Sequence, residues 1–140
     1  MRLTVQTDFA LRTLMYLAVN PGQHRIDDVA AHYAISKNHL MKVVQRLAAE
    51  GFIASARGRG GGLMLAAAPE AINLGTVVRR MEGISQFVEC FDPATNSCRA
   101  TPSCGLKHAL SGAVEAFMKH LDGFTLADLV RNRAAFLQVA

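Results

Sequence analysis

Three cysteines lie close together in the second half of this chain of 140 residues. Cys90, Cys98 and Cys104 are separated by seven and by five residues. The segment that contains them is rich in Pro, Asn and Ser, which excludes a regular helix or strand across most of it. A loop that gathers thiols can form a disulfide, a structural zinc site or an iron–sulfur site, or can hold free, redox-active thiols.

The spacing of the cysteines favours one of these chemistries. A disulfide would leave one thiol over, and nothing in the sequence indicates an oxidising compartment. Zinc usually takes four protein ligands, often from Cys-x2-Cys pairs, and the chain contains no such pair. Iron–sulfur clusters accept looser spacings and an occasional ligand that is not cysteine. We therefore favour an iron–sulfur cluster held by three thiolates and one other ligand, with free or redox-active thiols as the alternative.

Length and composition predict a single domain or a small domain with an appendage. Hydrophobic residues make up 51% of the chain, which is enough for a core. No apolar run is long enough for a transmembrane helix, and the N-terminus lacks the features of a signal peptide. We therefore expect a cytoplasmic protein without a membrane partner.

The net charge of +4 lies entirely in the first half of the chain. Residues 1–67 carry eight Lys or Arg against four Asp or Glu, whereas residues 68–140 carry seven of each kind. A basic half beside a neutral half suggests that the first half meets a polyanion.

Residues 1–67 are predicted to form a winged helix-turn-helix domain, with the helix-turn-helix at about 28–51. An amphipathic helix capped by Thr7 comes first, a short helix at 26–34 follows, and Ser36 caps a third helix that ends at Gly51. The third helix has a polar, basic face suited to the DNA major groove. The predicted DNA contacts of this region are Ser36, Lys37, Asn38, His39, Lys42, Gln45 and Arg46.

The predicted wing is a hairpin at about 52–66 with a glycine-rich tip. Arg57 and Arg59 lie at this tip, where glycine lets the backbone approach a DNA groove closely. A nucleotide-binding loop would need a helix directly after the glycines, and an apolar strand-like segment follows instead. We predict that both arginines contact DNA.

Residues 68–140 are predicted to contain a connecting helix, a cluster-binding loop and a dimerisation helix. Asn73 caps the connecting helix at 74–82, and the loop spans 88–104. The helix at 105–121 has a broader apolar face than one small chain can cover, which predicts a dimer. A Thr-x-x-Asp pattern from Thr125 starts a short tail helix. The predicted fold class is thus mainly α.

Asp8 follows the predicted cap of the first helix and stands four residues before Arg12. This order suits an ion pair on one helix face, in a turn where the helix dipole favours a carboxylate. Residue chemistry alone therefore assigns Asp8 to a local pair with Arg12.

Several segments resemble a family of winged-helix iron–sulfur repressors, and in particular its nitric-oxide-sensitive members. They are residues 1–12, 36–42, 57–62 and 98–110, the most specific being Thr-Pro-Ser-Cys-Gly-Leu-Lys at 101–107. The resemblance implies a homodimer on palindromic promoter DNA, with a cluster on Cys90, Cys98 and Cys104. It also implies that Asp8 of the partner subunit completes a [4Fe-4S] site, so that Asp8 and Arg12 form a switch. Nitric oxide would attack the cluster, lower DNA affinity and release genes for nitric-oxide detoxification.

The family also includes cluster-biogenesis regulators, which hold a [2Fe-2S] cluster with three cysteines and a histidine. That histidine lies three residues after the last cysteine, where this chain has Lys107. His108 is one residue further and should point elsewhere, because each helical residue turns the side chain by about 100°. A [2Fe-2S] cluster nevertheless remains the alternative to [4Fe-4S].

Three other functions remain open: a cluster-status regulator, a clusterless thiol-responsive regulator, and an electron-transfer or cluster-carrier protein. We do not expect an enzyme, because the chain shows no Ser/His/Asp or paired-carboxylate arrangement with a suitable spacing.

Overall fold

The structure is a computed structural model that describes residues 2–55, 61–83 and 87–137. It is mainly helical, with one small sheet, which confirms the predicted fold class. The helices are α1 (Val5–Val19), α2 (Ile26–Tyr33), α3 (Lys37–Ala49), α4 (Leu74–Glu82), α5 (Gly105–Asp122), α6 (Leu126–Leu129) and α7 (Arg133–Leu137). The strands are β1 (Ile53–Ser55) and β2 (Leu63–Leu65), and the 3-10 turns are η1 (Pro69–Ala71), η3 (Glu89–Phe91) and η4 (Thr101–Ser103).

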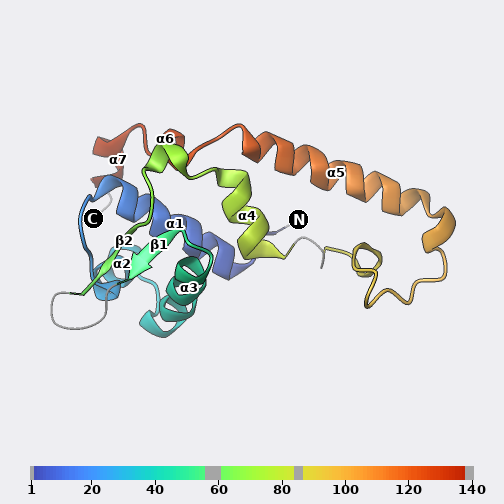
Figure 1. Cartoon of the computed structure of the whole chain (residues 1–140), viewed down its shortest axis with the longest axis horizontal. Helices are drawn as coiled ribbons and strands as arrows, with labels where there is room; N and C mark the ends of the chain where they lie inside the picture. Colours follow the sequence, from blue (N-terminus) through green and yellow to red (C-terminus); the bar gives the residue numbers. More distant parts are fainter. Residues whose placement is uncertain (1, 56–60, 84–86, 138–140) are drawn as a thin grey trace.

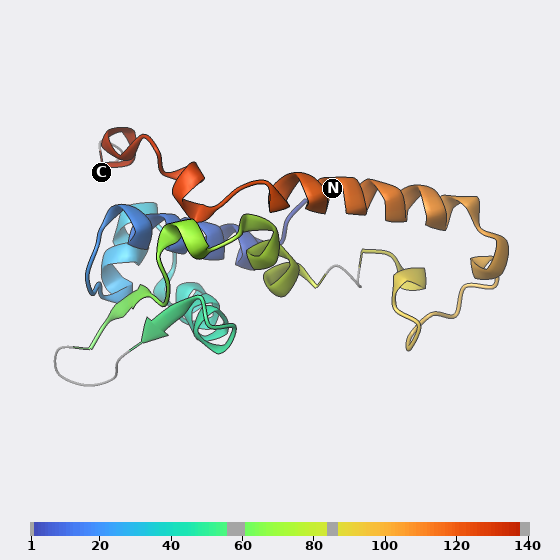
Figure 2. The ribbon, with the colours of Figure 1, turned by 45° about the horizontal axis from the view of Figure 1, so that its top comes forward.

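The molecule consists of a helical body and a projecting arm (Figures 1 and 2). The body contains α1, α2, α3 and the hairpin, with α4 against one end of α1. The arm is α5, which carries the cysteine segment at the end far from the body. At 1.5 Å per residue, the 18 residues of α5 span about 27 Å.

The core of the body lies where α1 meets α3. Leu14 of α1 and Leu40 and Leu47 of α3 are completely buried, and Val77 and Met81 of α4 extend the same core. Burial of a side chain of this size contributes about 1.5–3 kcal/mol to stability. The apolar stripe predicted for α3 is therefore the face that attaches it to the body, and its polar face is exposed.

The first helix begins three residues earlier than the sequence predicted. Its N-cap is Thr4, whose hydroxyl accepts a hydrogen bond from the Thr7 amide at 3.3 Å, whereas Thr7 is buried inside the first turn. Both threonines have a suitable side chain for a cap. Glu82 of α4 favours Thr4 over Thr7 as the N-cap, because its carboxylate accepts hydrogen bonds from the amide and the hydroxyl of Thr4.

The helix-turn-helix and the hairpin agree with the prediction. Ala34 takes the left-handed conformation (φ 52°) at the turn between α2 and α3, and Gly51 (φ 77°) ends α3. Ser36 stands at the N-cap of α3, but its side chain makes no capping hydrogen bond. The strands pair antiparallel, with Ile53 opposite Leu65. The hairpin tip, with Arg57 and Arg59, lies outside the described residues.

The boundaries of the later helices also agree with the prediction. Asn73 caps α4 by accepting the Thr76 amide at 3.0 Å, and Gly83 (φ 61°) ends the helix. Thr125 and Asp128 form the predicted capping box at the start of α6. None of the described helices has the length and apolar character that crossing a membrane would require.

The long helix α5 has three different faces. One face packs toward α4, and Met118 on it is the buried residue of the helix. A second face is polar and exposed. The third face is an exposed apolar stripe. It begins with Leu106 and continues through the smaller residues Ala109, Ala113 and Ala116. This stripe lies within the broad apolar surface from which the sequence predicted a dimer.

Candidate metal centre and nucleic-acid interface

The three cysteines occupy three different local structures. Cys90 lies in η3 and is half-buried, and Cys98 lies in an exposed turn. Cys104 is the N-cap residue of α5, and its sulfur accepts a hydrogen bond from the Lys107 amide at 3.4 Å. All three are free thiols. The first turn of α5 therefore fixes the position of the Cys104 sulfur.

The described part of one chain does not gather the predicted ligands into a single site. No group of three or more His, Cys, Asp or Glu side chains is close enough to hold a metal within residues 2–55, 61–83 and 87–137. The donor chemistry nevertheless fits an iron–sulfur cluster: three free thiols, one of them at a helix N-terminus, in a segment whose only helical structure is two 3-10 turns. The assignment of the three cysteines as ligands therefore stays a prediction.

Asp8 is paired with Arg12 in this chain, as residue chemistry alone predicted. The Arg12 guanidinium lies 2.8 Å from the Asp8 carboxylate, and both side chains are a little less than half exposed. One turn earlier, Thr4 is held by Glu82 at the end of α4, with 2.7 Å between the Thr4 nitrogen and the carboxylate. Asp8 thus lies close to the point where α1 is attached to α4.

The same helix, α4, also holds the C-terminal end of α3. The Arg46 guanidinium donates to the carbonyl of Arg80 at 2.6 Å, and the Arg80 guanidinium donates to the carbonyl of Glu50 at 3.1 Å. Arg80 also lies 3.5 Å from the Glu50 carboxylate and 5.8 Å from the centre of the Phe52 ring. Arg46, a predicted DNA contact, is thus also engaged in holding α3 to α4.

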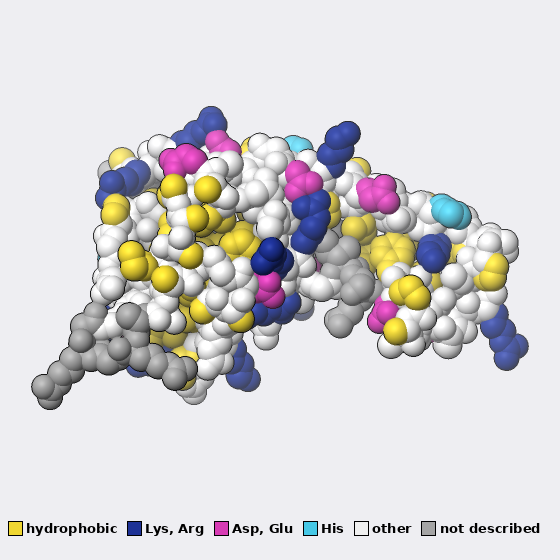
Figure 3. Space-filling view, viewed as in Figure 1, with side chains coloured by type: hydrophobic (Ala, Val, Ile, Leu, Met, Phe, Trp, Pro, Cys, Tyr) yellow, Lys and Arg dark blue, Asp and Glu magenta, His cyan; other side chains and the backbone are white. Residues whose placement is uncertain are grey.

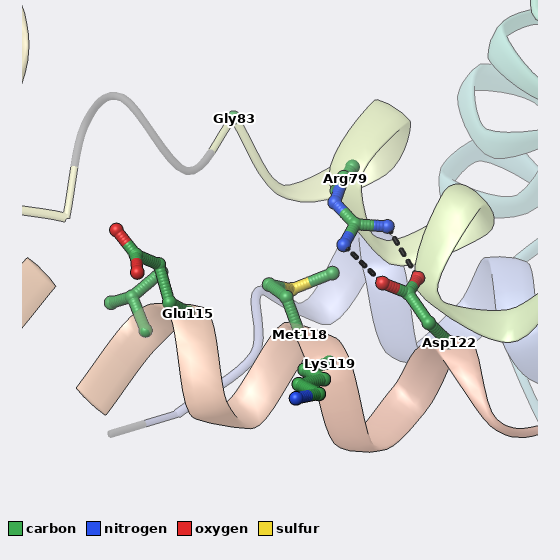
Figure 4. Close-up of a pocket in the computed structure, with 7 residues that line it drawn as sticks. Arg79, Gly83, Glu115, Met118, Lys119 and Asp122 are labelled. Atoms are coloured by element: carbon green, nitrogen blue, oxygen red, sulfur yellow. Dashed lines mark hydrogen bonds and ion pairs between the residues drawn. The ribbon is translucent and has the colours of Figure 1, made fainter. Parts of the chain in front are cut away.

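The base of α5 is attached to α4 by a bidentate ion pair. Arg79 donates to both oxygens of the Asp122 carboxylate, at 2.5 and 2.6 Å (Figure 4). This hydrogen bonding lowers the pKa of Asp122 and raises that of Arg79. A Cβ atom at Gly75 would collide with the same carboxylate, so glycine leaves room for the ion pair. Asn73 adds a 2.8 Å hydrogen bond to the carbonyl of Asp122.

A hollow of about 540 Å³ lies beside this ion pair, between α4 and α5. Figure 4 shows Met118, Lys119 and Glu115 along α5 on one side of it and Gly83 at the end of α4 on the other. Acidic and basic side chains alternate across the same region of the surface (Figure 3). The junction between α4 and α5 therefore combines a partly exposed ion pair with a largely apolar hollow that is open to solvent.

The predicted DNA-binding face of α3 is exposed. The side chains on this face are Ser36, Lys37, Asn38, His39, Lys42 and Gln45. Lys37 is paired with Asp27 of α2 at 2.7 Å, and both of these side chains are about half exposed. The face therefore combines amide groups and cations, as major-groove binding requires.

Sequence reasoning missed the polar residues of α4. Arg79, Arg80 and Glu82 each contact a different element: α5, the end of α3 and the start of α1. Three charged residues within four positions next to a buried stripe are a weak signal, because such residues are usually a solvated helix face. Their partners are 30 to 78 residues away along the chain, and no local pattern identifies them.

Known proteins share this sequence and fold over almost the whole chain. Residues 3–132 match the Rrf2 family, described as an iron-dependent transcriptional regulator. The HTH-type transcriptional regulator NsrR of Bacillus subtilis (strain 168) is 48% identical, over 99% of this chain and 97% of that protein. CymR of Staphylococcus aureus is 26% identical with a TM-score of 0.68, covering 90% of this chain and 95% of the other. IscR of T. potens, at 22% identity, shows the same fold with a TM-score of 0.74, covering 94% of this chain and 88% of the other.

Proposed function

This chain belongs to the Rrf2 family of transcriptional regulators, and on this basis we propose that it is a homodimeric repressor whose iron–sulfur cluster senses nitric oxide. Its relatives are DNA-binding regulators and not enzymes. Residues 1–67 would bind promoter DNA, and residues 68–140 would carry the cluster-binding loop and the dimerisation helix. The observation that carries the proposal is the trio of free thiols in a segment next to the helix that joins α1, α3 and α5.

In this proposal, Cys90, Cys98 and Cys104 hold the cluster, and Asp8 of the partner subunit is the fourth ligand. We favour [4Fe-4S], with [2Fe-2S] as the alternative. When bound, the cluster supplies iron that reacts with nitric oxide. A carboxylate is a harder ligand than a thiolate, so Asp8 would be the ligand released most easily. A released Asp8 would be free to form the 2.8 Å ion pair with Arg12.

The contacts of α4 support a route from Asp8 to DNA. Glu82 holds the start of the helix that carries Asp8, and Arg80 of the same α4 holds the end of α3. A small shift of α4 would therefore alter the position of α3 in each subunit. Two half-sites on DNA are engaged together only at one spacing of the two recognition helices, so such a shift would release DNA. Arg57 and Arg59 would contact the adjacent minor groove.

The first test is the iron and acid-labile sulfide content of protein purified without oxygen. Four iron and four sulfide per chain would support a [4Fe-4S] cluster. Two of each would support a [2Fe-2S] cluster and would make His108 a candidate ligand again. Absence of sulfide would overturn the cluster and favour a thiol-responsive regulator, for which exposed Cys98 is the first candidate.

The second test concerns Asp8. Loaded Asp8→Ala protein should respond differently to nitric oxide from wild type in a DNA-binding titration, because its fourth ligand is missing. Arg12→Ala is the matched variant, since it removes the same ion pair but keeps the carboxylate. Normal nitric-oxide release of DNA by Asp8→Ala would exclude Asp8 from the switch.

A further inference from the structure

One carboxylate closes the first part of the cysteine segment. The Oε1 atom of Glu89 accepts hydrogen bonds from the amide and from the hydroxyl of Ser97, both at 2.6 Å. Hydrogen bonds to an ionised acceptor are shorter and about twice as strong as those between neutral groups. Glu89 thus joins two points of the chain that are eight residues apart.

The two joined residues each stand directly before a cysteine. Glu89 precedes Cys90, and Ser97 precedes Cys98. Closing the loop at 89 and 97 therefore limits how far apart the backbones of these two cysteines can lie. The third cysteine is held differently, since Cys104 belongs to the start of α5 and its sulfur is bonded to the amide of Lys107.

The interior of the loop is also ordered by its own side chains. The Asp92 carboxylate accepts the Ala94 amide at 3.0 Å and the Thr95 hydroxyl at 3.1 Å, and the Asp92 carbonyl accepts the Asn96 amide at 3.0 Å. These bonds form a compact turn between the two joined ends. The closure by Glu89 is therefore not a single isolated contact across a loose loop.

The backbone of Cys98 is held on both sides. The side-chain oxygen of Asn96 accepts the Cys98 amide at 3.0 Å, and the Thr101 hydroxyl donates to the Cys98 carbonyl at 2.8 Å. A polar loop usually satisfies some of its own hydrogen-bonding groups, so these two bonds alone do not indicate a functional role. Their effect differs from that of Glu89, because they fix the local conformation of Cys98 and do not connect it to another cysteine.

We propose that Glu89 is a positioning residue that holds Cys90 and Cys98 as a preformed pair, onto which Cys104 is brought by α5. The use of this pair as part of a cluster site rests on the proposed function, whereas the pair itself is a property of the chain alone. A loop whose ends are already joined loses less conformational entropy when its thiols bind a common centre. Glu89 would therefore raise the affinity of the segment for that centre without touching it.

The pair is tested on cluster-free protein in a Cys104→Ser background, where Cys90 and Cys98 are the remaining thiols. The rate of disulfide formation with diamide is measured by mass spectrometry and divided by the alkylation rates of the two thiols. This normalisation separates distance from thiol reactivity. Glu89→Ala should slow the normalised rate about tenfold, since it removes two charge-assisted hydrogen bonds. Ser97→Ala should give a normalised rate between those of the parent and of Glu89→Ala, because the amide of residue 97 can still donate a hydrogen bond to Glu89.

Glu115→Ala is the matched control. It removes the same charge and a Glu–Ser hydrogen bond, from the Ser111 hydroxyl at 3.2 Å, but on α5 and outside the loop. It should leave the normalised rate unchanged. The proposed pairing of Cys90 and Cys98 would be overturned if the normalised rate of Glu89→Ala were within twofold of the parent rate. It would also be overturned if Glu115→Ala decreased the normalised rate by as much as Glu89→Ala.

Hydrogen exchange gives a second reading that needs no oxidation. In the full chain with all cysteines, the Ser97 amide should exchange at least fivefold faster in Glu89→Ala than in wild type, with exchange in α5 unchanged. Equal exchange in the two proteins would overturn the closure by Glu89.

Cluster loading separates this inference from the proposed function. Wild-type protein that binds no iron and sulfide would overturn the proposed function and leave the thiol pair standing. Glu89→Ala protein that loads iron and sulfide as fast as wild type, and retains them as long, would overturn the positioning role of Glu89 while leaving the cluster standing.

Discussion

At the scale of single residues, four acidic side chains are each bound to one particular partner. Asp8 pairs with Arg12, Asp122 with Arg79, Glu82 with Thr4 and Glu89 with Ser97. The hydroxyl and then the amide of Ser97 lower the pKa of Glu89, just as Arg79 lowers that of Asp122. Local donors therefore keep Glu89 and Asp122 ionised, and all four carboxylates act as structural anchors.

Tyr33 carries a polar group without a visible partner. Its hydroxyl is buried and has no hydrogen-bond partner among the described residues, while its ring makes edge contacts with His32 and Tyr16. Burial raises the pKa of Tyr33, so the group stays neutral. Because a buried, unsatisfied hydroxyl is costly, Tyr33→Phe should leave stability unchanged or raise it by about 1 kcal/mol in urea denaturation.

Tyr33→Leu is the companion variant, since it also removes the aromatic edge contacts. It should lower the free energy of unfolding by about 1–3 kcal/mol. A loss of stability in Tyr33→Phe as large as in Tyr33→Leu would mean that the hydroxyl has a partner in solution.

The Arg79–Asp122 pair predicts a pH-dependent contribution to stability. Since Arg79 lowers the pKa of Asp122 in the folded chain, the pair stabilises the fold above the pKa of an unfolded aspartate, near 4. The contribution is lost as the pH falls through the lower, folded value. The melting temperature of Asp122→Asn should therefore lie below that of wild type at pH 7, and the difference should shrink as the pH falls below 4. A difference that grows on acidification would contradict this.

At the scale of elements, α4 is the helix that connects the DNA-binding half of the chain to α5. Its nine residues bury one face in the core and use the polar residues of the other face on three neighbours: α1, α3 and α5. Gly83 ends α4 seven residues before Cys90 along the chain. The helix is therefore the part of the fold best placed to couple the two halves of the chain.

Arg80→Ala tests this coupling. It removes the contacts of Arg80 with Glu50 and Phe52, which should loosen the end of α3 and weaken promoter binding about three- to tenfold. The measurement is a DNA-binding titration at fixed salt. Arg79→Ala is the control, because it removes the same charge from the adjacent residue but breaks the contact with α5. Equal losses in the two variants would indicate a simple charge effect on DNA binding.

At the scale of the whole molecule, the arm exposes an apolar stripe that a second copy could cover. Leu106 is 66% exposed, and the stripe continues through alanines that would allow two helices to approach closely. Ala113→Glu would place a charge in the centre of this stripe. Under the proposed dimer, it should raise the dimer dissociation constant by about a hundredfold or more, because the buried carboxylate would lack a partner.

His108→Glu provides the comparison for Ala113→Glu. It adds the same carboxylate on the polar exposed face of α5, so light scattering should still detect a dimer. A dimer that persists in Ala113→Glu at low micromolar concentration would place the interface elsewhere.

Local sequence patterns predicted most of the helix and strand boundaries. The apolar stripe of α3, the Asn73 cap of α4, Gly83 at its end and the Thr125 capping box all lie where the sequence placed them. Each depends on residues within one or two turns, so the information is present in the chain itself. The pairing of Asp8 with Arg12 was predictable for the same reason.

What the sequence alone determined is therefore the set of elements, their apolar faces and the segment that gathers the thiols. The tertiary structure alone decided that α1 begins at Thr4, that α4 joins three elements and that Glu89 closes the loop before Cys98. In two of these cases the deciding partners are 30 or more residues away, and in the third a loop without periodicity brings the partners together. Contacts of this kind depend on where folding places two side chains. Residue type and local spacing do not determine these positions.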